Sequence, residues 1–206
     1  MSESSAEAPG LTLVLLTETP DAWAERSAAR LPEFLADHAV CELQASVFAL
    51  SLVGMYPDND ALMDRLSALA AEELGHFRRI AKETRRLGVI LPTKRRNAYV
   101  AALRAACRSG AEPAKGLDLL LVAALIEARS HERFLKLASH LRDERLVRLY
   151  RELADDEARH GPIYLELAVK HAGLEATVQR LDELLPIEAR ALSGGPGREI
   201  AVHAAV

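Results

Sequence analysis

Two short segments decide the fold, Glu73-Leu74-Gly75-His76 and Glu157-Ala158-Arg159-His160. Both repeat the pattern Glu-x-x-His, and both lie in long stretches whose apolar residues recur every three or four positions, which is the spacing of an α-helix. Side chains at i and i+3 project from the same helix face, so each pair can hold one metal ion. One such pair also arises by chance on a solvated charged face, but its repetition in two predicted helices favours a site.

The remaining sequence predicts an all-α protein, because strand-like alternation is nearly absent and Ala, Leu, Glu and Arg dominate. Breaks rich in Pro, Gly, Asp and Asn separate the helical stretches, notably at residues 56–60 and 109–113. We expect helices over residues 20–29, 31–54, 60–87, 97–108, 115–139, 143–171 and 174–192. Four long helices in two hairpins, joined by a long crossover and accompanied by short helices, describe a ferritin-like four-helix bundle.

The partner helices carry glutamates at matching heights. In an antiparallel hairpin, residues that face each other are equidistant from the turn. The midpoint between Glu42 and Glu73 falls in the Pro57–Asp58 turn, and the midpoint between Glu127 and Glu157 falls at residue 142, next to the other break. Two independent turns therefore predict that each of these glutamates faces the glutamate of a Glu-x-x-His pair.

Four inward-facing carboxylates would each cost several kcal/mol if they were left uncompensated, and two cations remove that cost. We predict a two-metal site in which one set of residues serves mainly one ion and a second set the other. The sets are Glu42, Glu73, His76 and Glu127, Glu157, His160. One Glu from each of two helices plus Glu-x-x-His from each of the other two is the di-iron carboxylate pattern. Oxygen-rich ligation with one imidazole per ion suits iron or manganese better than zinc or copper.

Neighbours of the ligands have two interpretations each. Glu72 and Asp156 each lie four residues before a ligand histidine, so they either accept a second histidine N–H or point to solvent. Tyr164, one turn after the second motif, either lines the cavity beside the metals or is a core tyrosine. His38, one turn before Glu42, and Tyr150, two turns before Glu157, either face the cavity or are ordinary core or surface residues, and the second interpretation is favoured.

Length and composition indicate one domain. The 206 residues are 50% hydrophobic and 27% charged, so we expect a single domain over residues 1–192 and a flexible C-terminal tail over residues 193–206. The two cysteines are too few for a disulfide framework. The first ten residues contain no basic residue, and the apolar run after them is short, so we predict neither a signal peptide nor a membrane span. A cytoplasmic protein is expected.

Positive charge is concentrated in one segment. Residues 78–108 hold ten Lys and Arg against one acid, Glu83, within a chain of net charge −4. A basic band on a mildly acidic protein indicates a polyanionic partner, and the plain alternative is a solvated basic face. The candidate residues are Arg85, Arg86, Lys94, Arg95, Arg96, Arg104 and Arg108.

Several phrases of the sequence resemble one family, the tRNA 2-methylthio-isopentenyladenosine hydroxylases. The Asp-Glu-x-Arg-His at residues 156–160 is similar to the motif of di-iron monooxygenases in general, whereas the other phrases are more specific. They are Thr19-Pro20-Asp21-Ala22-Trp23, Asp37-His38-Ala39-Val40-Cys41-Glu42, Glu72-Glu73-Leu74-Gly75-His76-Phe77 and Leu125-Ile126-Glu127-Ala128-Arg129-Ser130-x-Glu132-Arg133-Phe134. The resemblance covers about residues 11–175.

The resemblance implies an oxygen-dependent, non-haem di-iron monooxygenase that hydroxylates the isopentenyl side chain of a modified adenosine in tRNA. It implies two iron ions, dioxygen as co-substrate, and electrons from a separate ferredoxin or flavoprotein reductase, because the chain carries no flavin or iron–sulfur motif. The basic band would then contact tRNA phosphates. We expect a monomer or a small oligomer.

Two other functions remain compatible with the residues alone. The same ligand set serves as a ferroxidase centre in ferritin-like storage proteins, and as a peroxidase centre in rubrerythrins. Rubrerythrins usually carry paired Cys-x-x-Cys sequences, which this chain lacks. Storage cages tend to present acidic iron pathways, so the basic band disfavours a ferritin.

Overall fold

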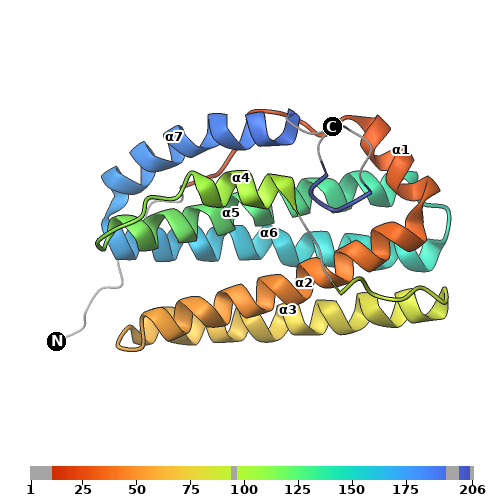
Figure 1. The fold of residues 1–206 in the computed structure, drawn as a ribbon, viewed down its shortest axis with the longest axis horizontal. Coiled ribbons are helices and arrows are strands. Elements are labelled where there is room, and N and C mark those ends of the chain that lie inside the picture. The colour runs from red at the N-terminus through yellow and green to blue at the C-terminus, as the bar shows by residue number, and fades with distance from the viewer. Residues whose placement is uncertain (1–10, 94–96, 194–199, 205–206) are drawn as a thin grey trace.

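The computed structural model describes residues 11–93, 97–193 and 200–204, and within these ranges all regular structure is helical (Figure 1). The helices are α1 (Asp21–Ala29), α2 (Leu31–Met55), α3 (Asp60–Arg86), α4 (Ala98–Ala105), α5 (Ala114–His140), α6 (Glu144–Ala172) and α7 (Leu174–Ser193). These bounds confirm the predicted helices to within three residues at each end.

The four long helices form two antiparallel hairpins, α2 with α3 and α5 with α6 (Figure 1). The segment that contains α4 crosses from the end of α3 to the start of α5, as a ferritin-like bundle requires. Helices α1, α4 and α7 cover the α5/α6 hairpin on the side away from α3 (Figure 1).

Local sequence explains where the long helices start and stop. The Asn59 side chain caps α3 by accepting from the Leu62 backbone N–H at 3.0 Å, and Asp143 caps α6 in the same way. Helix α6 ends at Gly173, whose φ of +86° favours glycine. Helix α4 ends earlier than predicted, at Ala105, because the buried Asp118 carboxylate draws the Arg108 backbone N–H away from the helix, at 2.7 Å.

The apolar core is divided into two clusters along the bundle. On α2, Phe34 and Leu35 precede Glu42 and belong to one cluster, whereas Ala49 and Leu52 follow it and belong to the other. Both clusters contain residues with no exposed surface, so the charged middle of the bundle is enclosed by packed apolar layers at both ends.

Helix α2 is long and apolar enough to cross a membrane by composition alone, a property that core helices also have. In this fold it pairs with α3 and carries Glu42 inward. Several of its apolar side chains, including Leu43, Val47 and Phe48, line a cavity rather than the core, which accounts for its unusual apolarity.

The C-terminal segment differs from the expected flexible tail. Residues 194–199 and 205–206 lie outside the described residues, but Val202, His203 and Ala204 are buried against the bundle. Their backbone is held by hydrogen bonds from Arg133 and to Asp37. The segment's short apolar sequence gives no helical or strand period, so local pattern alone could not place it.

Candidate metal centre

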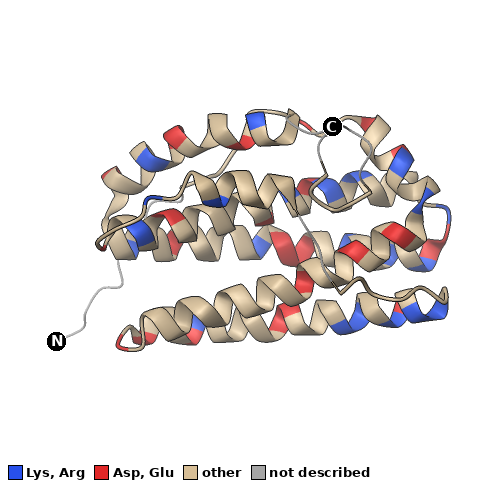
Figure 2. Ribbon diagram, in the orientation of Figure 1, with Lys and Arg blue, Asp and Glu red and all other residues tan. Residues whose placement is uncertain are grey.

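The six predicted ligands meet at the middle of the bundle, where Figure 2 shows acidic residues gathered between the long helices. None is more than 5% exposed. They form two overlapping groups whose candidate ligand atoms lie within 4.8 Å of one another. One group is Glu42, Glu73, His76 and Glu157, and the other is Glu73, Glu127, Glu157 and His160. Because Glu73 and Glu157 belong to both groups, they are the two carboxylates that would be shared if two ions were bound.

The ligand atoms face one another without satisfying one another. His76 Nδ1 lies 3.5 Å from Glu73 Oε2, and His160 Nδ1 lies 2.6 Å from Glu73 Oε1. Among the described residues, no hydrogen bond satisfies either Nδ1 atom, either oxygen of Glu73, or Oε2 of Glu157. Each such buried polar atom costs about 1–3 kcal/mol. A cation placed among these atoms satisfies all of them, so the residues fit a metal site.

Electrostatics support the same interpretation. Burial, and then repulsion from Glu73 and Glu157, raise the pKa of Glu42 well above its ordinary value. Burial and the neighbouring Glu157 raise the pKa of Glu127 in the same way. Without metal ions, the protein therefore cannot keep all four carboxylates ionised in this space. Two bound multivalent cations would keep them ionised.

The outer nitrogens of the two histidines are bound crosswise between the hairpins. His76 Nε2 on α3 lies 3.0 Å from Asp156 Oδ2 on α6, and His160 Nε2 on α6 lies 3.2 Å from Glu72 Oε2 on α3. Arg159 also contacts both outer carboxylates. When Nε2 donates its proton, the Nδ1 lone pair is left facing the centre, as metal ligation requires. Glu72 and Asp156 therefore contact the ligand histidines, each across the bundle rather than within its own helix.

The sequence interpretation missed one buried chain of contacts. His38 Nε2 is hydrogen-bonded to Glu42 Oε1, and His38 Nδ1 lies 2.9 Å from the Tyr150 hydroxyl. Phe34 and Phe134 pack around this pair. Burial raises the pKa of Tyr150 well above 10, so its hydroxyl keeps the proton that it donates to His38. The position of His38 in the sequence could have indicated this contact, because a residue four positions before Glu42 lies on the same helix face.

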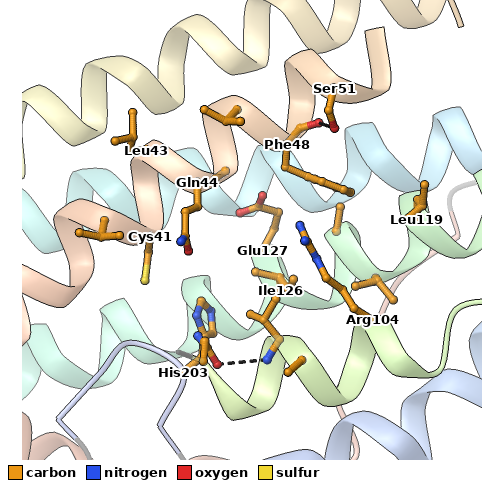
Figure 3. A pocket seen from close by; sticks show the side chains of 18 of the residues that line it. Cys41, Leu43, Gln44, Phe48, Ser51, Arg104, Leu119, Ile126, Glu127 and His203 are labelled. Atoms are coloured by element: carbon orange, nitrogen blue, oxygen red, sulfur yellow. Dashed lines mark hydrogen bonds between the residues drawn. The ribbon is translucent and has the colours of Figure 1, made fainter. Parts of the chain in front are cut away.

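A cavity of about 1030 Å³ opens onto the centre between α2, α4 and α5. Glu127 and Tyr164 are among its lining residues, so the cavity reaches one of the six clustered residues directly. In Figure 3 the labelled side chains surround this space, with Phe48 and Ile126 close to Glu127. Most lining residues are apolar, and the polar exceptions include Gln44, Asn97, Arg104 and His203. Tyr164 is a buried member of the apolar core and also lines the cavity, so both of its interpretations hold.

The residues of the predicted basic band are dispersed. Arg85 and Arg86 lie at the end of α3, where Figure 2 shows a row of basic residues, and Arg86 pairs with Glu83. Arg108 is bound by Asp118 at the start of α5. The Arg104 guanidinium instead lies 5.1 Å from the Phe48 ring centroid in the cavity wall. Lys94, Arg95 and Arg96 lie outside the described residues.

Comparisons with known proteins agree with this site. Residues 7–204 match the family described as tRNA-(MS2IO6A)-hydroxylase (MiaE). A Pseudomonas putida protein named tRNA 2-(methylsulfanyl)-N(6)-isopentenyladenosine(37) hydroxylase is 39% identical over 96% of this chain and 95% of its own length. A Salmonella typhimurium protein of the same name is 31% identical over 91% of this chain and 86% of its own length.

A solved structure is also similar throughout. It is named Protein 43 with aldehyde deformylating oxygenase activity from Synechococcus, and it superposes with a TM-score of 0.88 at 38% identity, covering 93% of this chain and 96% of that one. The family match spans residues 7–204 and therefore includes all six clustered carboxylates and histidines. The chain therefore belongs to the MiaE family of tRNA hydroxylases.

Proposed function

We propose that this protein is an oxygen-dependent di-iron hydroxylase that acts on the isopentenyl side chain of 2-methylthio-isopentenyladenosine in tRNA. The observation that carries the proposal is the junction between the six-residue centre and an apolar cavity at Glu127. The names of the two curated relatives supply the substrate class. Two iron ions held by the six residues would supply the oxidation of a carbon–hydrogen bond by dioxygen.

The protein itself holds the metal ions, orients the two histidines and excludes water from the cavity. Glu42, Glu73, Glu127 and Glu157 supply the oxygen ligands, and the two histidines are turned inward by Asp156 and Glu72. The apolar wall excludes water from the space beside Glu127 and suits a branched five-carbon side chain. Manganese is the alternative metal ion for the same donor residues.

The remaining partners complete the proposal. Electrons come from a separate ferredoxin or flavoprotein reductase, because the sequence holds no redox cofactor motif of its own. The tRNA phosphates meet the basic segment that contains Lys94, Arg95 and Arg96. The protein works in the cytoplasm as a monomer or small oligomer.

A second candidate is aldehyde deformylation, favoured by the similar Synechococcus structure and by a cavity large enough for an alkyl chain. Ferroxidase activity is a third, since the ligands alone suit it. Nucleoside analysis of tRNA from cells without this protein, and after restoring the gene, separates them. Loss of the hydroxylated nucleoside, accumulation of its precursor and return on complementation support the hydroxylase. Unchanged nucleosides reject it, and turnover of long-chain aldehydes by purified protein then becomes the next assay.

A further inference from the structure

The C-terminal residues 200–204, here called the strap, are bound as tightly as a core element. Val202 is fully buried, and its backbone N–H donates to Asp37 Oδ2 on α2 at 2.9 Å. Trp23 Nε1 on α1 donates to the Ala201 carbonyl at 3.3 Å. The strap therefore connects two helices that are remote from it in sequence.

Arg133 on α5 gives the strong anchor. Its side chain is fully buried, and its guanidinium donates to the carbonyl oxygens of Val202 and Ala204 and to Thr19 Oγ1. The Arg133 guanidinium also lies over the Trp23 ring, 4.6 Å from its centroid. Without the strap, two of these acceptors vanish and a buried cation is left under-satisfied, which is one of the largest penalties a core can carry.

His203 connects this anchored segment to the cavity. Its neighbours Val202 and Ala204 pack in the core, while His203 is among the residues that line the cavity (Figure 3). The imidazole lies parallel to the Tyr99 ring, with centroids 5.3 Å apart and 7° between planes, and its Nε2 is 3.1 Å from Ser130 Oγ. The Tyr99 hydroxyl donates in turn to buried Glu188 at 2.8 Å. The ring is therefore held in one orientation.

The cavity is larger than the reacting group requires. A cavity of about 150 Å³ holds benzene, whereas this one measures about 1030 Å³. It therefore has room for a purine as well as a five-carbon chain. Histidine side chains are among those on which nucleobases stack, and His203 is a flat ring fixed in the wall.

We propose that the strap forms part of the wall of the substrate cavity through His203, and that His203 is a specificity-determining residue that contacts the purine ring of the modified nucleoside. The ligand identity rests on the proposed function, whereas the wall itself rests on the strap contacts alone. Ring surface is the property that matters, so His203→Phe should keep most of the contact and His203→Ala should lose it. Ile200→Ala is the matched control, because Ile200 packs in the strap without lining the cavity.

The test uses the iron-loaded protein. We expect His203→Ala to raise both the KM for tRNA and the Kd of the free 2-methylthio-isopentenyladenosine nucleoside by about tenfold. The kcat and iron content should remain those of the wild type, whereas the thermal midpoint falls because a buried ring and its Ser130 contact are lost. His203→Phe should restore binding. Equal KM and Kd values in wild type, His203→Ala and Ile200→Ala would overturn the proposal.

Deletion of residues 200–206 tests the wall separately. We expect the midpoint temperature to fall by about 5–10 °C and an apolar fluorescent probe to bind more readily in the opened cavity. Unchanged stability and probe binding would overturn the wall. If wild-type protein neither binds nor hydroxylates the nucleoside, the proposed function fails instead. The role of the strap as cavity wall is then decided by comparing how the apolar probe binds to His203→Ala and to Ile200→Ala. Only His203→Ala should change probe binding, because His203 lines the cavity and Ile200 does not.

Discussion

His160 Nε2 on α6 lies 3.2 Å from Glu72 Oε2 on α3. Glu72, which directly precedes Glu73, therefore orients the histidine of the other Glu-x-x-His pair. The relationship is reciprocal, because Asp156, next to Glu157, orients His76 at 3.0 Å. Each hairpin therefore completes the site of its neighbour. A hairpin alone would present a correctly spaced Glu-x-x-His pair whose histidine is free to turn.

The crossed contacts predict selective coupling. In a double-mutant cycle on metal-free protein, Glu72→Ala should couple to His160→Ala by about 0.5–3 kcal/mol. It should couple more weakly to His76→Ala, which it reaches only through Arg159 and Asp156. Free energies of unfolding from urea titrations provide the measurement. Coupling to His76 instead would mean that Glu72 acts within its own helix.

Removing Glu127 should remove metal. Glu127→Ala deletes one of the six donors and leaves the rest of the cluster, so we expect iron loss at one or both positions, measured by elemental analysis of reconstituted protein. Glu166→Ala, an exposed carboxylate on α6, is the control and should keep full loading. Two irons per chain in Glu127→Ala would contradict the ligand set.

The Tyr150–His38 chain should tighten metal binding through Glu42. Tyr150→Phe keeps the packed ring but leaves His38 Nδ1 without its partner, so Glu42 is held less firmly. Loss of an outer hydrogen bond of this kind typically costs about 10–100-fold in metal affinity. Competition with a chelator measures it. Tyr56→Phe, whose hydroxyl instead bonds Glu112 at 2.8 Å, should bind metal like the wild type, and equal affinity in both variants would remove the chain from the site.

Charge reversal at Lys94, Arg95 and Arg96 should weaken tRNA binding and leave the metal content unchanged. Each lost phosphate contact should also reduce the slope of log affinity against log salt by about one. Arg148→Glu is the control, since Arg148 is an exposed cation on α6 outside the basic segment. An unchanged affinity at moderate salt would exclude the segment from tRNA recognition.

Acid should weaken the junction of α4, α5 and α7 at Asp118. Burial raises the pKa of Asp118, but hydrogen bonds from Arg108 and Arg180 outweigh it, so the folded pKa lies below the ordinary value. Its stabilisation is therefore complete above the unfolded pKa of about 3.9 and is lost as pH falls through the folded pKa. Asp118→Asn should cost about 3 kcal/mol at pH 7, and this cost should shrink as the pH falls through the folded pKa. Urea unfolding over a descending series of pH values tests this against the exposed Asp64→Asn, and a cost that does not fall with pH would contradict it.

The sequence by itself determined the helices and the six clustered residues. Spacing of three residues puts Glu73 and His76 on one helix face whatever surrounds them, and equal distance from a turn places Glu42 opposite Glu73 in any antiparallel hairpin. Both rules are local, so they hold before the hairpins dock. The register matched the structure because each long helix runs without a break through the site.

Only the tertiary structure decided which outer carboxylate serves which histidine, that His38 and Tyr150 support Glu42, and that the strap lines the cavity. These contacts join residues from 69 to 178 positions apart, except for His38 and Glu42 on one helix. They depend on how the hairpins rotate and approach each other, which packing fixes and helical periodicity does not. The strap is the clearest case, because its few apolar residues gain a fixed place from contacts with Arg133, Asp37 and Trp23, which lie on three different helices.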